Sequence, residues 1–546
     1  MNNKNKGNRI LMLLIIGGGG GYIAAQLLRL QCFYIYNIIN SDMSSEMVLA
    51  RQLAEQGKWL LSDNWYYSTE LRVVNTQLIS AFIFRFTDNW QLVRALTAII
   101  LYLVCGGAVA FLGKSLNWKC WVIFLCELLM LIPYSWEYLG IVQFGCFYYP
   151  HIILMFFALG VFFYSEKKKV CVLYWLLISF LMGLGGLRYL LILHIPAVCA
   201  GLSLLIKKRE FYDFMIYPTR KNIERLLGLN ETRYAAVNIS GGVMAGVGYI
   251  VMEKLLRKRF IFQSFNDLSY LNFGEKGESI FGIFGKVIMG IPEIMGFKYD
   301  VRLMSVQGLL NVFILLLVLV ILICVSVQIK RVFVGKDSLD SPERNNYTSD
   351  FILLQFLFSF LSNLFIFVFA GNYTSRYWIL VLIWLIPLLA VFMNGVERAS
   401  NLFRLCILSI IVYALVNGTV VLNDAIKHNN SANRYAVNRY LIDQNINVGY
   451  STFWNANITT EMTNGEIKIL PINSESDLVI YKWLTPRDFY YDDRQIDELS
   501  FILLSRQEAE QVQDIPLYQN GQIGYMDSSF VVYTFKRDYL ESQISY

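Results

Sequence analysis

Two carboxylates, Asp42 and Glu46, lie four residues apart just after the first hydrophobic segment of the chain. A carboxylate at the surface of a membrane could accept a proton from a substrate hydroxyl, which is general-base chemistry. The competing interpretation of Asp42 is structural, because an aspartate at the start of a helix can accept backbone N–H groups as an N-cap. Both interpretations of Asp42 stay open at the level of sequence.

Two arginines, Arg188 and Arg376, could supply the positive charge that such chemistry needs. Each precedes a tyrosine, Tyr189 or Tyr377, and each is predicted to lie at the outer end of a hydrophobic segment. A guanidinium fork matches the oxygens of a phosphate, so these residues are candidates for binding a lipid phosphate. The alternative is an arginine at a helix end whose charged group simply reaches out of the membrane.

Metal chemistry has little support from residue spacing. The chain has three histidines and nine cysteines, and no pair of either type has the spacing of a zinc site. The cysteines fall in or beside apolar segments, where they are expected to be small packing residues. No sugar-nucleotide Asp-x-Asp motif or glycine-rich phosphate loop is present, which disfavours a cytosolic nucleotide-sugar enzyme.

Composition shows which elements must position these residues. Hydrophobic residues make up 56% of the chain and charged residues only 16%, and many apolar runs are about 20 residues long, enough to cross a bilayer. We therefore predict a polytopic α-helical membrane protein with about eleven spans and a retained first helix. The predicted spans are residues 10–32, 91–113, 119–133, 148–164, 170–185, 187–206, 236–252, 306–328, 350–370, 377–393 and 405–422.

The distribution of Lys and Arg predicts the orientation of these spans. Basic residues gather in alternate loops, which are expected to face the cytoplasm together with the N-terminus. The long loops 33–90 and 253–305 and the C-terminal domain then face outward, in a bacterial plasma membrane. The net charge of +6 reflects this bias of the loops, so it does not argue for nucleic acid as a partner.

Two segments outside the spans have a predicted structure. Residues 44–57 have an amphipathic helical pattern that Gly57 ends, which predicts a helix lying flat on the outer membrane surface. We divide the chain into a transmembrane domain, 1–422, and a small extracytoplasmic α/β domain, 423–546. The second domain is predicted to have strands at 446–451, 466–471, 478–482, 500–504 and 529–535 and a helix at 505–513.

The first 110 residues resemble the GT-C membrane glycosyltransferases, in particular bacterial relatives of the dolichyl-phosphate-mannose protein mannosyltransferases and the aminoarabinose transferases. The resemblance lies in the order of a first helix, Asp42-x-x-x-Glu46, Ala50-x-x-x-Ala54-x-x-Gly57-x-Trp59, a polar stretch and Val93-Arg94-Ala95-Leu96-Thr97-Ala98. The arginine–tyrosine pairs at Arg188 and Arg376 are similar to elements of such enzymes. The C-terminal segment is similar to a small extracytoplasmic domain of bacterial members.

This resemblance implies transfer of a sugar from a polyprenyl-phosphate carrier to an acceptor on the outer face of the membrane, a hexosyltransferase activity. It implies that Asp42 is the catalytic base or, in some branches, a metal ligand, so Mg²⁺ or Mn²⁺ is a possible but uncertain cofactor. The acceptor is a glycan, lipid or protein of the cell envelope. Further candidates are Glu46, Glu70, Glu137 and His151 for the acceptor or as a second acid, and Arg188, Arg376, Tyr377 and Arg72 for the lipid phosphate.

Two other functions stay open at this stage. A transporter of lipid-linked saccharides should show internal repeats and charged or broken helices at the bilayer midplane, and no half-to-half repeat is evident in the sequence. A surface-polysaccharide polymerase or ligase would also use arginines in its outer loops, but it would not need the Asp42 arrangement.

Overall fold

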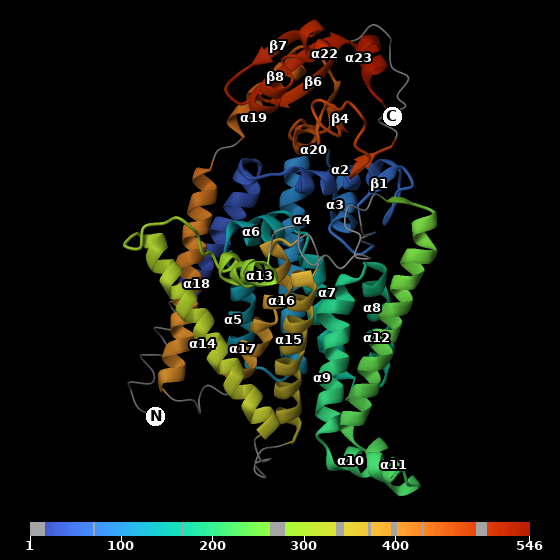
Figure 1. The fold of residues 1–546 in the computed structure, drawn as a ribbon, viewed down its shortest axis with the longest axis vertical. Coiled ribbons are helices and arrows are strands. Elements are labelled where there is room, and N and C mark those ends of the chain that lie inside the picture. Colours follow the sequence, from blue (N-terminus) through green and yellow to red (C-terminus); the bar gives the residue numbers. More distant parts are fainter. Residues whose placement is uncertain are drawn as a thin grey trace.

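A computed structural model shows a bundle of long helices with a sheet domain at one end (Figure 1). The structure describes residues 17–68, 71, 73–165, 168–262, 279–334, 343–369, 373–394, 401–428, 431–487 and 499–545. Residues 17–29 are helical and continue into η1 (Leu30–Tyr34) and η2 (Ile35–Asn37). We call the end of the bundle that carries the sheet domain the domain end.

The bundle is built from apolar helices joined by short turns. Three of its segments, η1, η3 and η4, are π-helical, a geometry that is found most often as single turns at functional sites. The elements are α4 (Trp90–Ser115), α5 (Cys120–Leu131), α6 (Trp136–Tyr138), η3 (Leu139–Phe144), α7 (Tyr149–Tyr164), α8 (Val170–Leu184), η4 (Leu190–His194), α9 (Ile195–Ile206), α10 (Arg209–Ile216), α11 (Arg220–Leu227), α12 (Asn230–Lys254), η5 (Leu256–Lys258), α13 (Ile280–Ile294), α14 (Val306–Val334), α15 (Glu343–Phe369), η6 (Ser375–Trp378), α16 (Ile379–Leu382), α17 (Leu385–Asn394) and α18 (Asn401–Lys427).

Six helices of the described chain are long and apolar enough to cross a membrane, or up to eight if each of two bent helix pairs is one span. The bent pairs join Cys120–Leu131 to Trp136–Phe144 at 97° and Leu190–Ile206 to Arg209–Ile216 at 80°. Helices α7 and α8 are apolar but shorter. The predicted polytopic helical architecture is confirmed. The total of about eleven spans stays a prediction, because residues 10–16 of the predicted first span lie outside the described residues.

The loop between the first helix and α4 folds into a compact layer at the domain end. It contains α2 (Ser41–Glu55), β1 (Trp65–Tyr67) and α3 (Gln77–Phe84). Strand β1 pairs in parallel with β2 (Ile261–Phe262) and antiparallel with β5 (Thr485–Pro486), so three distant parts of the chain share one small sheet. Gly57 follows the end of α2 with a positive φ of 66°, a conformation that favours glycine.

The helix predicted over residues 44–57 is present as α2, but other parts of the chain cover most of it. It begins at Ser41, and most of its residues are buried, including the serines of its first turns. These small polar side chains let a helix of the C-terminal domain approach one side of α2, while α3 packs on another. Sequence periodicity could not show which distant segments cover the polar face of α2, and its position on the outer membrane surface stays a prediction.

The C-terminal domain is a five-stranded sheet with helices packed against it. The strand order is β4-β3-β6-β8-β7; β3 pairs in parallel with β4 and β6, whereas β8 pairs antiparallel with β6 and β7. Its elements are α19 (Ala432–Asp443), β3 (Val448–Thr452), α20 (Phe453–Met462), β4 (Lys468–Ile472), β6 (Leu499–Ser505), α21 (Arg506–Gln511), α22 (Pro516–Asn520), β7 (Gln522–Met526), β8 (Phe530–Lys536) and α23 (Arg537–Gln543).

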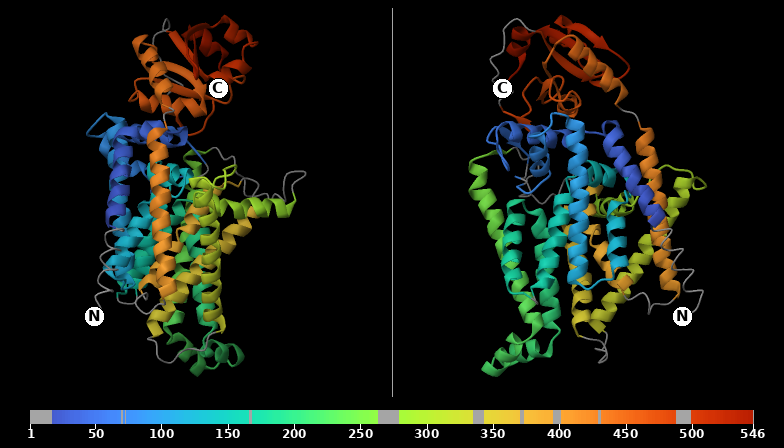
Figure 2. Two further views of the ribbon diagram at one scale, coloured as in Figure 1. Left: turned by 90° about the vertical axis from the view of Figure 1, so that its left-hand side faces the viewer. Right: turned by 180° about the vertical axis from the view of Figure 1, so that it is seen from behind.

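Four of the predicted strands and the predicted helix match elements of this domain, namely β3, β4, β6, β8 and α21. The segment 478–482 forms only isolated bridges, through Val479 and Ile480. The sequence analysis missed β7 and helix α20. Figure 2 shows the domain seated over the end of the bundle, far from α10 and α11, which lie at the opposite end with their basic residues.

Candidate functional site

Asp42 lies in the first turn of α2, and Asn40 rather than Asp42 is the N-cap. The Asn40 side chain accepts a hydrogen bond from the backbone N–H of Met43 at 3.0 Å. The group that caps the helix, the Asn40 side chain, is therefore distinct from the Asp42 carboxylate. Asp42 is not needed to begin the helix. The positive end of the helix dipole favours a negative charge at this position.

The carboxylate of Asp42 is half-buried, and no described residue donates a hydrogen bond to it or forms an ion pair with it. Tyr481, from the C-terminal domain, is close enough to sense its charge. Burial raises the pKa of the Tyr481 hydroxyl and the negative charge of Asp42 raises it further, so the phenol stays neutral beside the carboxylate. This arrangement leaves Asp42 able to accept a proton from a bound molecule.

A buried ion pair holds the C-terminal domain against the bundle. Arg94 of α4 makes two parallel hydrogen bonds to Glu461 of α20, with Nε to Oε1 and Nη2 to Oε2 both 2.7 Å. Arg94 also donates to the backbone oxygen of Met43 at 2.9 Å, and both charged side chains are buried. One arginine therefore connects α4, α20 and the residue next to Asp42.

Neutral contacts reinforce this junction. The Ser41 hydroxyl donates to the backbone oxygen of Phe453, the first residue of α20. At the other end of α20, the backbone N–H of Trp90 donates to the Asn464 side chain at 3.0 Å. Gly465 approaches Trp90 so closely that an added Cβ would lie 3.1 Å from the indole ring. The first turn of α2 is thus fixed between the bundle and α20.

Glu46 lies one turn further along α2 and is buried. Its Oε2 accepts hydrogen bonds from the side chains of Asn75 at 3.2 Å and Thr76 at 3.3 Å. These contacts tie α2 to the residues that lead into α3. We infer a structural role for Glu46, distinct from that of the more accessible Asp42.

Replacing Glu46 with alanine is expected to lower the free energy of unfolding by about 1–3 kcal/mol, because buried donors lose their acceptor. Thermal unfolding of the purified protein, followed by tryptophan fluorescence, measures this. The exposed Glu55 of the same helix provides the matched control, Glu55→Ala. An unchanged melting temperature in Glu46→Ala together with lost activity would instead place Glu46 in the reactive site.

The predicted residues Arg188 and His151 come together at the domain-facing ends of α7 and α8. The Arg188 guanidinium lies over the ring of Tyr148, 5.3 Å from its centroid. His151 is buried and stacks on Tyr189 with centroids 4.7 Å apart, and its Nδ1 donates a hydrogen bond to the backbone oxygen of Phe147 at 3.2 Å. The structure thus joins one predicted phosphate ligand and one predicted acceptor residue in a single aromatic cluster.

Arg376 lies in η6, close to the crossing helix α13, which the left view of Figure 2 shows projecting sideways from the bundle. Tyr373 and Trp378 of this segment donate to the backbone oxygen of Val287 in α13, at 3.1 and 2.8 Å. Tyr377 packs against Phe367. Arg376 itself is half-buried, and no carboxylate of the described chain pairs with it.

The remaining predicted residues are not brought to Asp42 by any described contact. Glu137 is exposed in α6. Glu70 and Arg72 lie outside the described residues, as do Asp267, Glu275 and Glu278 of the long loop 253–305. Glu293 of that loop accepts a hydrogen bond from Tyr299 at 2.7 Å.

The described residues contain no group of three His, Cys, Asp or Glu side chains that could hold a metal ion. The predicted Mg²⁺ or Mn²⁺ would therefore not be held by an all-protein cage of these residues. We derive no step of the reaction through a metal.

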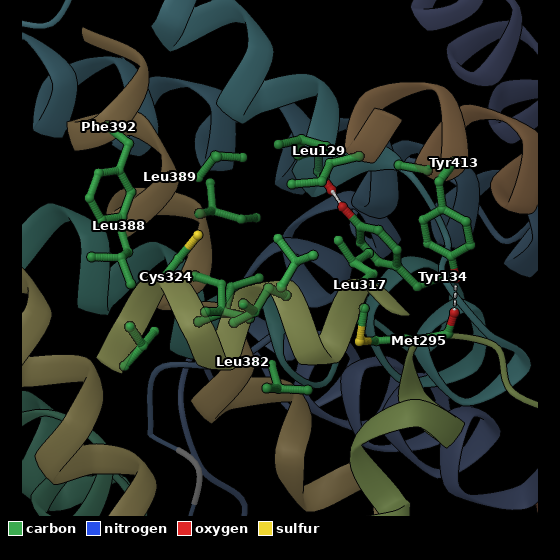
Figure 3. Close-up of a pocket in the computed structure, with 18 of the residues that line it drawn as sticks. Leu129, Tyr134, Met295, Leu317, Cys324, Leu382, Leu388, Leu389, Phe392 and Tyr413 are labelled. Atoms are coloured by element: carbon green, nitrogen blue, oxygen red, sulfur yellow. Dashed lines mark hydrogen bonds between the residues drawn. The ribbon is translucent and has the colours of Figure 1, made fainter. Parts of the chain in front are cut away.

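An apolar cavity of about 390 Å³ opens between α5, α14, α16, α17 and α18 (Figure 3). Leu129, Leu317 and Leu389 line it, and the hydroxyls of two wall tyrosines are already engaged. Tyr134 donates to the oxygen of Leu129 at 2.9 Å, and Tyr413 donates to the oxygen of Met295. Walls that are almost entirely apolar suit a hydrocarbon chain.

Sequence reasoning missed Glu461 and Tyr481 as neighbours of the α2 turn. For Glu461 the sequence held a partial signal. Arg94 lies in a segment of the family resemblance, and a buried arginine needs an acidic partner. Nothing in the spacing of the chain could have selected Glu461 over the other acids, since 367 positions separate the two residues.

No protein-family model matches this chain, and no curated protein is similar enough to count as a relative. Among solved structures, the chain is similar to ArnT from Cupriavidus metallidurans bound to undecaprenyl phosphate, with 11% identity and a TM-score of 0.41 over 94% of this chain and 98% of that one. The apo state of that ArnT matches with 10% identity and a TM-score of 0.37, over 96% and 99%. At these values the likeness does not establish the family, so the function is inferred from this chain's own residues.

Proposed function

We propose that this protein transfers a sugar from a polyprenyl-phosphate carrier to an acceptor at the domain end of the bundle, with Asp42 as the general base. The observation that carries this proposal is the half-buried Asp42 carboxylate, which has no described hydrogen-bond partner although its helix turn is tightly fixed. A rigidly held base without competing partners is what proton abstraction from an acceptor hydroxyl requires.

The reaction would proceed by inverting displacement at the sugar. Asp42 takes the proton of the acceptor hydroxyl as its oxygen forms the new bond to the anomeric carbon, and the bond to the lipid phosphate breaks with its electron pair. The leaving phosphate gains negative charge, which a guanidinium can stabilise. Arg376 is our first candidate because it has no described carboxylate partner, and Arg188 is the second.

The surroundings of the bundle are compatible with a lipid donor. Candidate membrane spans form the walls of the apolar cavity, which would accommodate part of the isoprenoid chain. The basic helix α11 lies at the end opposite the C-terminal domain (Figure 1). With basic segments retained on the cytoplasmic side, the C-terminal domain and Asp42 would be extracytoplasmic, in the plasma membrane.

The test of this function measures transfer of labelled hexose from polyprenyl-phosphate hexose to envelope glycans, lipids and proteins in membranes that contain the protein. Transfer that requires both the donor lipid and the intact protein supports the proposal. Movement of the intact lipid-linked sugar across the membrane, without cleavage of its phosphate bond, would instead show a transporter.

Replacing Arg376 with alanine should raise the KM for the polyprenyl-phosphate donor roughly 10- to 100-fold, since a hydrogen bond to a charged group contributes about 1.5–3 kcal/mol. Arg376→Lys should recover only part of the loss, because an ammonium lacks the fork geometry. Arg302→Ala, at an exposed arginine, is the control. A donor KM that stays at the wild-type value in Arg376→Ala would transfer the phosphate-binding role to Arg188.

A further inference from the structure

Four aromatic residues of the C-terminal domain form a continuous group, which we call the aromatic platform: Phe453, Trp454, Tyr481 and Trp483. The ring of Phe453 contacts Trp454 edge-on at 5.4 Å between centroids and Tyr481 at 5.9 Å. Tyr481 in turn lies 6.4 Å from Trp483. Trp454 is 62% exposed, which is unusual for the largest apolar side chain.

The platform is anchored on both sides. The Asn457 side chain, on α20, donates to the backbone oxygen of Leu484 at 3.1 Å, which connects the segment carrying Tyr481 and Trp483 to α20. The next two residues form β5, which pairs with β1 of the layer beneath. The rings are therefore held by secondary structure on the same side of the molecule as α2.

The platform borders the candidate base. Phe453 accepts the hydrogen bond of Ser41, the residue directly before Asp42, and α20 packs along α2. A molecule resting on these rings would therefore lie beside the Asp42 carboxylate. The hydroxyl of Tyr481 and the indole N–H of Trp454 or Trp483 add polar edges to these apolar rings.

This combination of aromatic faces, polar edges and a nearby carboxylate fits a saccharide. The face of an aromatic ring carries partial negative charge and attracts the polarised C–H groups on one side of a pyranose, while the sugar hydroxyls bond to polar groups at the rim. A membrane-interface belt is the other common use of exposed tryptophan. The platform differs from such a belt because its rings lie on the sheet domain rather than at the end of a membrane-spanning helix.

We propose that the aromatic platform binds the acceptor saccharide and presents one of its hydroxyls to Asp42. This proposal rests on the proposed function for the identity of the reaction, but the binding of a sugar can be measured without turnover. The acceptor class is then a glycan or a glycolipid rather than an unmodified protein side chain.

The first experiment measures binding of maltotriose, cellotriose and mannotriose to the full-length protein by quenching of tryptophan fluorescence. We expect saturable quenching by at least one trisaccharide, with an affinity roughly three- to tenfold weaker in Trp454→Ala and close to wild type in Trp454→Phe, which keeps an aromatic face. Trp59→Ala removes a 51% exposed tryptophan outside the platform and is the matched control. Absence of quenching in the wild type at millimolar trisaccharide would overturn the proposal.

The second experiment measures KM for each substrate in the transfer reaction of the same variants and of Trp483→Ala. A higher KM for the acceptor with an unchanged KM for the donor supports the platform as the acceptor site. A higher KM for the donor alone would overturn that assignment and show that the platform binds the donor sugar. Quenching of the Trp454 fluorescence by brominated lipids in reconstituted vesicles, with unchanged KM values in Trp454→Ala, would show a membrane belt and overturn the proposal. Sugar binding without any transfer would contradict the proposed function and leave the platform standing.

Discussion

Replacing Glu461 with alanine is expected to lower the free energy of unfolding by about 3–5 kcal/mol, because it leaves the buried guanidinium of Arg94 without its partner. Both side chains are shielded from water, and their two hydrogen bonds are each 2.7 Å long. Water cannot replace the lost carboxylate unless the junction opens. We therefore expect the C-terminal domain to separate from the bundle in this variant.

Two measurements check this. Thermal unfolding should show a lower melting temperature, and limited proteolysis should cleave faster between α18 and α19, where the domain joins the bundle. Glu466→Ala removes an exposed acid from the same domain and should change neither. If the melting temperature and the cleavage rate of Glu461→Ala equal those of the wild type, the ion pair does not hold the domain in place.

A paired substitution separates the loss of attraction from the cost of an unpaired charge. Replacing both Arg94 and Glu461 with methionine removes both buried charges, and comparable exchanges in other proteins are often neutral or stabilising. We expect the double variant to recover most of the stability lost in Glu461→Ala. Its transfer activity should recover less, because methionine cannot donate the hydrogen bond that Arg94 gives to the Met43 oxygen beside Asp42.

Replacing Asp42 with asparagine is expected to reduce the rate of sugar transfer by about 10²–10⁴-fold, the contribution that a positioned general base typically makes. The change is nearly isosteric, and no described residue hydrogen-bonds the Asp42 carboxylate. Stability should therefore stay close to wild type. The expected result is a folded protein that binds donor and acceptor but transfers slowly.

The comparison of Asp42→Asn with the wild type requires a control variant on the same helix. Glu55→Gln neutralises an exposed acid that forms an ion pair with Arg51, and it should leave transfer unchanged. Size-exclusion profiles and melting temperatures of both variants would confirm that they are folded. Wild-type transfer by Asp42→Asn would exclude Asp42 as the base and move the search to the acids outside the described residues, Glu70 first.

The position of Asp42 illustrates how far sequence reasoning reaches. Its place just after the first hydrophobic segment, and the family resemblance around it, selected it among 41 acidic residues. A helix over residues 44–57 that ends at Gly57 was also predicted, since local spacing and backbone preference determine it. The observed helix begins at Ser41 and therefore includes Asp42, which was expected to precede it. Whether Asp42 is the N-cap could not be settled from the sequence, because Asn, Ser and Asp side chains can all cap a helix and all three types occur beside one another here.

The sequence by itself determined the polytopic helical architecture, the bias of basic residues along the chain and most strands of the C-terminal domain, since hydrophobic length and periodicity are local properties. Only the tertiary structure decided that α20 covers α2, that Arg94 pairs with Glu461 and that Tyr481 lies beside Asp42. These contacts join residues hundreds of positions apart. Their energy depends on burial and geometry that exist only once the chain has folded, so no local pattern in the sequence encodes them.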